Sequence, residues 1–215
     1  MAADQQFIAK LKSIRLFRDL EAQNSVACDQ LIDSGELKVW GAGDTVISAA
    51  TSDPSLHVLV KGTLKIQPMD DEGRPVGGCS TINSGELIGE ISLLLNTPST
   101  ALVTVPDGEK TVVTFRIPRG IIAEIDDHRL VHADAKIHIY RQLVMLLRWR
   151  NDVYRMKYPN NAVASAIYSV PPFSGERGTL EELAHLRKQA VYLANRLKNL
   201  NLALGSLDRS TAEAS

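Results

Sequence analysis

The residues with the clearest chemical potential lie between positions 87 and 101, around Gly89 and Glu90. A glycine and a glutamate open a short apolar turn, which breaks at Pro98 and returns to small hydroxyl residues. A tight loop that leads into a helical turn directs several backbone N–H groups at one point, which suits a phosphate or another anion. The glutamate beside it can accept a hydrogen bond from a sugar hydroxyl. A strand–turn–strand corner with an exposed glutamate explains the same local sequence, so the context must decide.

A second group of functional residue types stands at Arg148, Trp149 and Arg150. Arginine can hold a phosphate through two parallel hydrogen bonds, and an indole or guanidinium plane can stack on a base. The simpler interpretation is a solvated basic face of a helix that holds an acidic region or a partner protein.

Other reactive residue types do not form a recognisable site. His128 and His132 lie one helical turn apart, a spacing that can bind a metal, but no third ligand is evident. Ser92, Ser99 and Thr100 have no nearby His and Asp arrangement that would activate a nucleophile. We therefore expect no metal, no cofactor and no enzymatic activity.

The bulk composition is that of an ordinary globular protein. The chain has 215 residues, of which 44% are hydrophobic and 23% charged, and its net charge is −1. That charge argues against general binding of nucleic acid, which needs a positive excess. The longest apolar run, 143–147, is too short to cross a bilayer, and the N-terminus lacks the features of a signal peptide. Cys28 and Cys79 fit no metal or redox spacing. We expect a cytoplasmic protein that does not enter the membrane.

Short β runs separated by turn signals occupy the first half of the chain. Glycine, aspartate and proline clusters mark the turns, and strands at this spacing predict a sandwich or barrel. The predicted strands are 36–40, 45–48, 56–60, 63–67, 77–82, 101–105 and 111–117.

Helical periodicity marks both flanks of this region. Helices are predicted at 4–18, 22–33 and 119–126, followed by a long helix from about 128 to 156 that Pro159 stops. The long helix carries an apolar seam with an asparagine, as in a two-stranded coiled coil. The seam comprises Ile137, Tyr140, Val144, Leu147, Asn151 and Tyr154. It favours a homodimer through this helix; a helix that only covers its own sandwich is the alternative.

The C-terminal part begins with a proline- and glycine-rich linker, 159–178. Thr179 to Glu182 then form a capping box, and an apolar heptad seam follows until Gly205 ends the predicted helix. This seam must pack on the long helix or on a second subunit. It comprises Leu183, Leu186, Ala190, Leu193, Leu197, Leu200 and Leu204. The tail 206–215 is predicted to be disordered.

Four ordered segments resemble the cyclic-nucleotide-binding domain, the double-stranded β-helix module of catabolite-activator-type bacterial regulators, protein kinase regulatory subunits and gated channels. Segment 11–17 resembles the family's opening helix, 39–47 its first strand pair and 56–66 its central hairpin. Segment 88–101 resembles its phosphate-binding cassette. The resemblance covers about residues 8–157. It implies an α+β fold, a jelly-roll-like β-roll with an N-terminal helical arm, a long helix after the roll and one additional terminal helix.

The resemblance also implies a ligand site. It assigns nucleotide binding to Gly89, Glu90, Ile91, Ser92, Ser99, Thr100 and Ala101. In the family, the glutamate accepts a bond from the ribose hydroxyl, and the residue after the cassette proline is usually an arginine that pairs with the cyclic phosphate. Here that residue is Ser99. Because the family's long helix covers the base, Arg148 and Trp149, with Arg150 beside them, are candidates to replace the missing arginine.

Family members that regulate transcription carry a helix-turn-helix after the long helix. Here the heptads run straight through the corresponding region, and 179–215 holds five Lys or Arg against four Asp or Glu. We therefore expect no direct binding of DNA.

Two hypotheses follow for the function. The leading one is a non-enzymatic regulatory or adaptor protein that senses cyclic AMP, cyclic GMP or cyclic di-GMP and acts through a protein partner. The alternative is a ligand-free scaffold that has kept the fold and lost the pocket. The predicted units are a roll with N-terminal helices (1–126), a dimerisation and lid helix (127–158), the linker (159–178), an amphipathic helix (179–205) and the tail.

Overall fold

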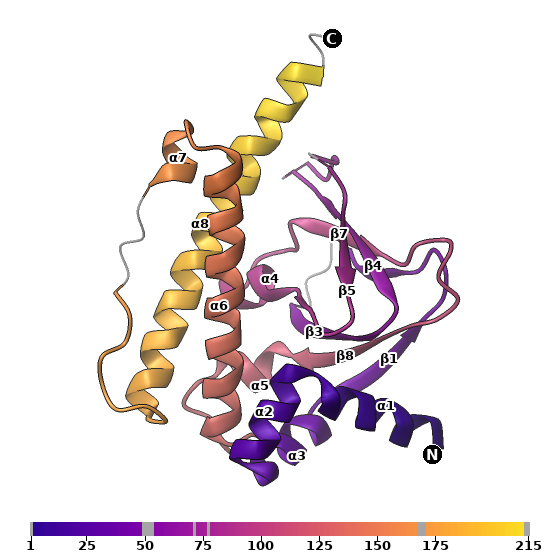
Figure 1. The fold of residues 1–215 in the computed structure, drawn as a ribbon, viewed down its shortest axis with the longest axis vertical. Helices are drawn as coiled ribbons and strands as arrows, with labels where there is room; N and C mark the ends of the chain where they lie inside the picture. Colours follow the sequence, from indigo (N-terminus) through magenta and orange to yellow (C-terminus); the bar gives the residue numbers. More distant parts are fainter. Residues whose placement is uncertain (1, 49–53, 71, 77, 167–170, 213–215) are drawn as a thin grey trace.

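The computed structural model describes residues 2–48, 54–70, 72–76, 78–166 and 171–212 (Figure 1). Within these residues, antiparallel strands form two four-stranded sheets with the orders β1-β8-β3-β6 and β2-β7-β4-β5. The strands are β1 Glu36–Trp40, β2 Thr45–Ile47, β3 Ser55–Lys61, β4 Thr63–Pro68, β5 Ser80–Asn83, β6 Leu87–Ile88, β7 Ala101–Thr104 and β8 Val112–Pro118. The predicted roll is therefore confirmed.

The observed strands follow the predicted ones closely. The strand predicted at 77–82 begins at Ser80, and residue 77 lies outside the described residues. β6 was not predicted, because a two-residue strand is too short to display alternation. It pairs with β3, where Ile88 is opposite His57, and so fixes the start of the cassette to the first sheet.

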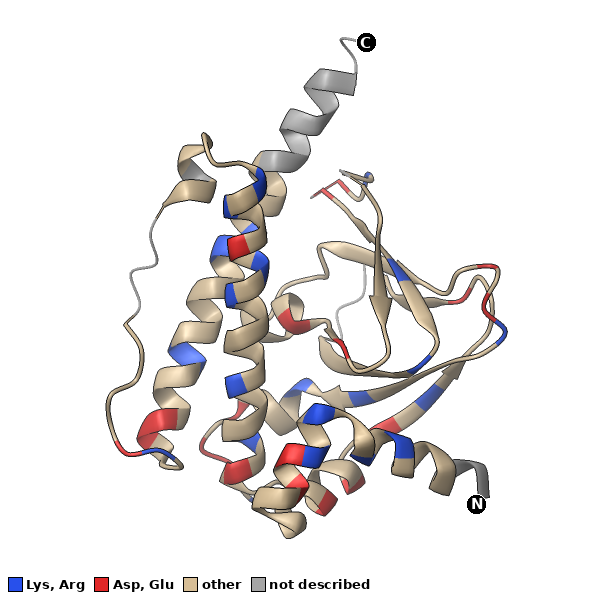
Figure 2. Ribbon diagram, viewed as in Figure 1, with Lys and Arg blue, Asp and Glu red and all other residues tan. Residues whose placement is uncertain are grey.

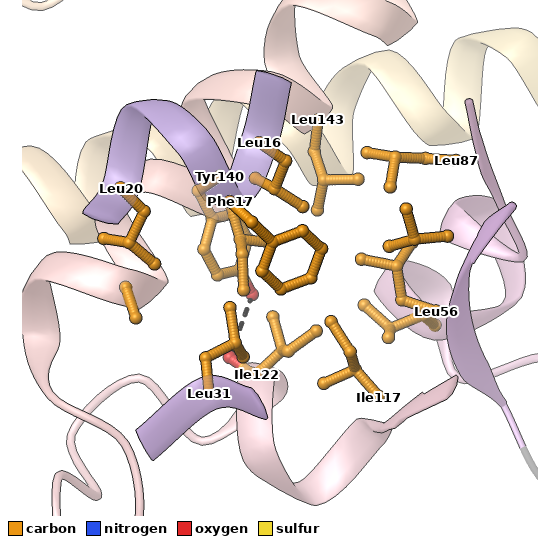
Figure 3. Close-up of a cluster of buried hydrophobic side chains, with 14 of the residues drawn as sticks. Leu16, Phe17, Leu20, Leu31, Leu56, Leu87, Ile117, Ile122, Tyr140 and Leu143 are labelled. Atoms are coloured by element: carbon orange, nitrogen blue, oxygen red, sulfur yellow. Dashed lines mark hydrogen bonds between the residues drawn. The ribbon is translucent and has the colours of Figure 1, made fainter. Parts of the chain in front are cut away.

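The two central strands of the first sheet, β3 and β8, are buried on both faces, and alternate residues of each strand point to opposite sides. Leu59 and Val112 face the second sheet and pack inside the roll. Val58 and Phe115 lie on the other face and contact the helices. In this larger core, the Phe17 and Phe115 rings meet edge to face with centroids 5.5 Å apart. Figure 3 shows Phe17 of α2 in this core beside Tyr140.

Three helices precede the roll: α1 Ala2–Ser13, α2 Arg15–Gln23 and α3 Ser25–Asp33. The single helix predicted at 4–18 was wrong, because the chain is extended at Ile14, where ψ is 138°. This break lets the buried Phe17 reach the sheet. The second predicted helix, 22–33, begins later, because the Asn24 side chain caps α3 by accepting a hydrogen bond from the N–H of Ala27.

The helices after the roll's first half are α4 Glu90–Leu95, α5 Arg119–Ala123, α6 Ala133–Lys157, α7 Ala162–Ser165 and α8 Leu180–Ala212. α6 begins at Ala133 rather than 128, because His132 is its N-cap and accepts a bond from the N–H of Asp134. No helix among the described residues is long and apolar enough to span a bilayer.

The predicted end of the last helix at Gly205 was wrong, since α8 continues to Ala212. A glycine inside a helix costs only about 1 kcal/mol relative to alanine, and its neighbours here are compatible with a helix. The predicted disordered tail is therefore helical from 206 to 212, and 213–215 lie outside the described residues.

α8 lies against α6 and continues beyond its end (Figure 1). They run parallel, because successive residues of α6 contact successively later residues of α8. Arg141 forms two hydrogen bonds with the Glu182 carboxylate, at 2.8 and 2.7 Å, and Asn151 Nδ2 donates to the Leu193 carbonyl at 3.2 Å. The described seam residues of α8 are buried: Leu183, Leu186, Ala190, Leu193, Leu197 and Leu200. The seam predicted for a coiled coil thus pairs within one chain.

Candidate functional site

A cavity of about 390 Å³ lies where the cassette, the second sheet, α6 and α8 meet. Its volume falls within the usual range of about 300–1,000 Å³ for small-molecule sites. Of the nine residues predicted to bind a ligand, eight line it: Gly89, Glu90, Ile91, Ser92, Ser99, Thr100, Ala101 and Trp149. The turn that the sequence singled out therefore forms one wall of a cavity.

Gly89 fixes the shape of the cassette. It precedes α4 with a φ of 85°, in the left-handed region that favours glycine. A Cβ at this position would lie 2.3 Å from the Ser55 carbonyl oxygen of β3. No other residue fits this turn without moving β3. Because of this turn, the next residue, Glu90, is directed toward α6.

Glu90 is buried, with only 3% of its surface exposed, and it forms an ion pair with Arg150 of α6. Arg150 also donates from Nη2 to the Leu87 carbonyl oxygen at 3.3 Å. One guanidinium group therefore binds the cassette both before and after Gly89. A buried carboxylate without such a partner would carry a large desolvation cost.

The cavity receives Arg150 rather than Arg148, which is not among its lining residues. Two residues that are two positions apart on a helix point about 200° away from each other. Once Trp149 is placed at the cavity, only one of its two neighbours can reach the cassette. The sequence pointed to both arginines, but it could not show which of them lies on the face of α6 that meets the cassette.

The hydroxyl of Ser99, which stands at the family's arginine position, is used within its own loop. Ser99 Oγ donates to the Ala101 carbonyl oxygen at 2.9 Å and accepts from the Ala101 N–H at 3.2 Å. Ser92 likewise donates to the Gly89 carbonyl oxygen at 3.0 Å. These bonds keep the cassette loop in shape, and they place short side chains where the family has a long cation.

The cavity is open. Trp149 lies at its edge with 60% of its surface exposed, so the indole does not fill it. Leu94 and Leu95 of α4 pack against the large hydrophobic core instead. The charged groups of the lining balance formally, because Glu86 and Glu90 are matched by Arg150 and Lys157.

α8 supplies two lining residues that the sequence did not predict, Leu197 and Asn201. Tyr154 of α6 also lines the cavity, and its hydroxyl donates to Asn201 Oδ1 at 2.6 Å. The heptad seam was the available signal, because Tyr154 belongs to the seam of α6 and Asn201 follows Leu200 of the seam of α8. The heptad pattern did not show that these two helices of one chain pack on each other.

Basic residues follow α6 from end to end (Figure 2). Ion pairs between described residues include Arg141 with Glu182, Arg150 with Glu90, and Arg155 with Asp152. Within the described part of the chain, no three or more His, Cys, Asp or Glu side chains gather in a way that could hold a metal. His132, one of the two histidines considered above, acts as a helix cap.

The two antiparallel sheets, the glycine-initiated cassette and the flanking helices form the β-roll that the resemblance implied. No family model matches the sequence, and no curated protein matches it. Similar solved structures include the cAMP-bound regulatory domain of Toxoplasma gondii PKA, with 13% identity, a TM-score of 0.48 and coverage of 64% of this chain and 49% of that one. The chain thus spans about half of that structure.

Two further solved structures are similar. The sensor domain of the transcriptional regulator DNR from Pseudomonas aeruginosa is 17% identical, with a TM-score of 0.47 and coverage of 75% of this chain and 97% of that one. A mutant of a cAMP-binding acyltransferase from Mycobacterium smegmatis is 21% identical, with a TM-score of 0.45 and coverage of 66% of this chain and 41% of that one. At these identities the likeness concerns the fold.

Proposed function

We propose that this protein is a non-enzymatic regulatory protein that senses a nucleotide messenger in the cavity beside Gly89 and Glu90. The observation that carries the proposal is the open cavity of about 390 Å³, which is lined by a buried carboxylate of the cassette and by side chains of α6 and α8. The roll (1–126) is the sensing unit, and the long helix (127–158) is its lid.

The candidate ligands are cyclic AMP, cyclic GMP and cyclic di-GMP. The volume lies near the lower end of the range for small-molecule sites, which favours a cyclic mononucleotide over a dinucleotide about twice its size. The lining residues Gly89 to Ser92 and Ser99 to Ala101 hold the sugar and phosphate in this proposal. Trp149 and Arg150 approach the ligand from α6, and Arg148 is left out because it does not line the cavity.

The ion pair between Glu90 and Arg150 provides a route for transmitting the signal. A ribose hydroxyl that donates to Glu90 competes with the guanidinium for the same carboxylate. Arg150 is then available to a phosphate, and α6 is no longer held to the cassette in the same way. Ligand binding favours one position of α6 over another, as any such signal requires.

The output of the proposed sensor is a protein partner rather than DNA. Beyond α6, the described residues hold the four-residue α7 and the single long α8, and no pair of helices with a helix-turn-helix arrangement. A cytoplasmic location agrees with this role. A homodimer belongs to the proposal as well, through the face of α6 that does not contact α8.

Isothermal titration calorimetry with cyclic AMP, cyclic GMP and cyclic di-GMP tests the proposal. We expect heat of binding with at least one cyclic mononucleotide. Glu90→Gln should weaken that binding about tenfold or more, because a charged hydrogen bond to the ligand is lost. The matched control is Glu72→Gln, which also removes a glutamate paired with an arginine, but on the surface.

Absence of heat with all three nucleotides at millimolar concentration would contradict the sensor and favour the ligand-free scaffold. That alternative has its own support, since both Glu90 and Ser99 already have hydrogen-bond partners within the chain. It predicts that Glu90→Gln leaves partner binding unchanged.

A further inference from the structure

The described lining of the cavity carries no surplus of positive charge. It contains two carboxylates, Glu86 and Glu90, and two cations, Arg150 and Lys157. A cyclic nucleotide brings one negative charge, which loses water when the phosphate enters the cavity. Removing a charge from water is costly unless a cation compensates for it. A phosphate therefore gains affinity here only if one of the two cations can pair with it.

The cassette wall of the cavity, residues 89–92 and 99–101, contributes a single charged side chain, the Glu90 carboxylate. The Ser92 and Ser99 hydroxyls both donate to backbone carbonyl oxygens of the cassette, at 3.0 and 2.9 Å. A hydroxyl has one O–H to donate. A phosphate at this wall would therefore have to break a hydrogen bond of the cassette before it could receive one from either serine.

Arg150 of α6 reaches the cassette but is already paired there. It forms an ion pair with the buried Glu90, and its Nη2 donates to the Leu87 carbonyl oxygen at 3.3 Å. To bind a phosphate, the guanidinium must give up contact with Glu90 and leave that carboxylate less compensated. One ion pair is then exchanged for another, so the phosphate adds little to the affinity of the ligand.

The helical wall, formed by the lining residues of α6 and α8, offers Lys157 as the other cation. Lys157 is exposed at the end of α6, and its ammonium group lies 5.1 Å from the centroid of the Tyr158 ring. Water and salt screen an exposed charge, so its attraction for a phosphate is small. By contrast, a ribose hydroxyl that donates to Glu90 and a base that stacks on Trp149 require no cation.

We propose that this cavity binds nucleosides at least as tightly as the corresponding cyclic nucleotides. The inference rests on the proposed function, whose site and sugar contact it keeps, and it names the ligand class of that site. Ile66, Val103 and Trp149 give the base apolar and aromatic surface, and stacking on an aromatic ring accepts any base. The base and the ribose thus carry the affinity, and a nucleoside avoids the desolvation of a phosphate.

Calorimetry with adenosine, guanosine, cyclic AMP and cyclic GMP on the wild-type chain tests the ligand class. Each nucleoside should bind with a Kd equal to or lower than that of its cyclic nucleotide. The Kd of adenosine should not change when salt is raised from about 0.1 to 1 M, which shortens the Debye length from about 10 to 3 Å. 2′,3′-Dideoxyadenosine should bind about tenfold more weakly than adenosine, because it lacks the hydroxyls that can donate to Glu90.

Ser99→Arg supplies the cation that the cassette wall lacks. It should tighten the binding of cyclic AMP about ten- to a hundredfold and leave the binding of adenosine unchanged, because only the nucleotide has a phosphate. The matched control is Ser99→Gln, which adds a long polar side chain without a charge and should not change the ratio of the two affinities. Circular dichroism verifies that each chain is folded.

The ratio of the adenosine and cyclic AMP affinities separates the outcomes. Adenosine binding that equals or exceeds that of cyclic AMP, with a ratio that moves toward cyclic AMP in Ser99→Arg but not in Ser99→Gln, supports the inference. A wild-type chain that binds cyclic AMP more tightly than adenosine overturns it and leaves the proposed function standing, as does a ratio that is unchanged in Ser99→Arg. A wild-type chain that binds none of the four ligands overturns both.

Discussion

At the scale of single residues, the candidate site combines a buried carboxylate with a small hydroxyl residue at the position where the resembled family has an arginine. Glu90 keeps the position that accepts a sugar hydroxyl in the resembled family, and it is buried beside Arg150. Ser99 stands where the family's arginine would meet the phosphate, and its hydroxyl bonds to Ala101 of its own loop. The cassette therefore keeps the turn and the carboxylate, but its residue 99 carries no cation that could pair with a phosphate.

Replacing Ser99 with arginine should restore that contact. A guanidinium–phosphate hydrogen bond contributes about 1.5–3 kcal/mol, so Ser99→Arg should tighten the binding of cyclic AMP roughly ten- to a hundredfold. Calorimetry measures the change, and Thr97→Arg on the same loop controls for added charge. An affinity no higher than that of the Thr97→Arg chain would show that position 99 does not face the phosphate.

At the scale of elements, the start of α8 is held to α6 by one glutamate. Glu182 is buried and accepts two bonds from Arg141 and a third from the Gly178 N–H at 2.6 Å. Its own N–H donates to Thr179 Oγ1, which completes most of the predicted capping box. Burial favours the protonated carboxyl, but these hydrogen bonds outweigh it and lower the pKa of Glu182.

Glu182→Gln should therefore lower the free energy of unfolding at neutral pH by about 1–3 kcal/mol, because the hydrogen bonds to a charged carboxylate are lost. Because the pKa of Glu182 is lower in the folded chain than in the unfolded one, its contribution is present above the ordinary pKa of glutamate. It disappears as the pH falls through the folded-state pKa. Thermal unfolding followed by circular dichroism should thus show a wide gap between variant and wild type at pH 7 and a narrower gap in acid.

The neighbouring Glu181→Gln serves as the control, because Glu181 is exposed on the first turn of the same helix. An equal loss of stability in both variants would mean that only the general charge of the helix start matters.

Local signals in the sequence were sufficient for most of the fold. Turn residues located the strands, and the heptads located α6 and α8. They could not show which segments, far apart in the sequence, pack against each other. Ile14 interrupts a helical periodicity because Phe17 must reach Phe115, a residue about a hundred positions away. For the same reason, the choice of Arg150 over Arg148 and the place of Asn201 in the lining became visible only with α6 and α8 packed against the roll.

At the scale of the whole molecule, one apolar stripe stays exposed on α6. It lies on the face away from the buried seam and consists of Met145, Trp149, Val153 and Met156. Spacings of four, four and three residues keep these side chains on one side of the helix. A stripe with this spacing can pack against a second copy of itself, so the proposed homodimer would use it.

Met145→Glu combined with Met156→Glu tests this surface, because neither residue lines the cavity. Light scattering should give the mass of two chains for the wild type and of one chain for the double variant, because acidic groups at both ends of the stripe repel in the dimer. Val26→Glu, which changes an exposed apolar residue of α3, should not alter the mass. A wild-type chain with the mass of a monomer would rule out this dimer.

The parallel pairing of α6 with α8 within one chain affects how the response to a messenger would depend on protein concentration. The linker of about twenty residues keeps α8 near α6 at a fixed effective concentration, whatever the amount of protein in the cell. Cassette wall and helical wall are therefore assembled by a first-order step within each chain. Formation of the cavity itself would therefore need no second chain. Protein concentration would affect the response only through the proposed homodimer, whose stripe shares Trp149 and Val153 with the lining of the cavity.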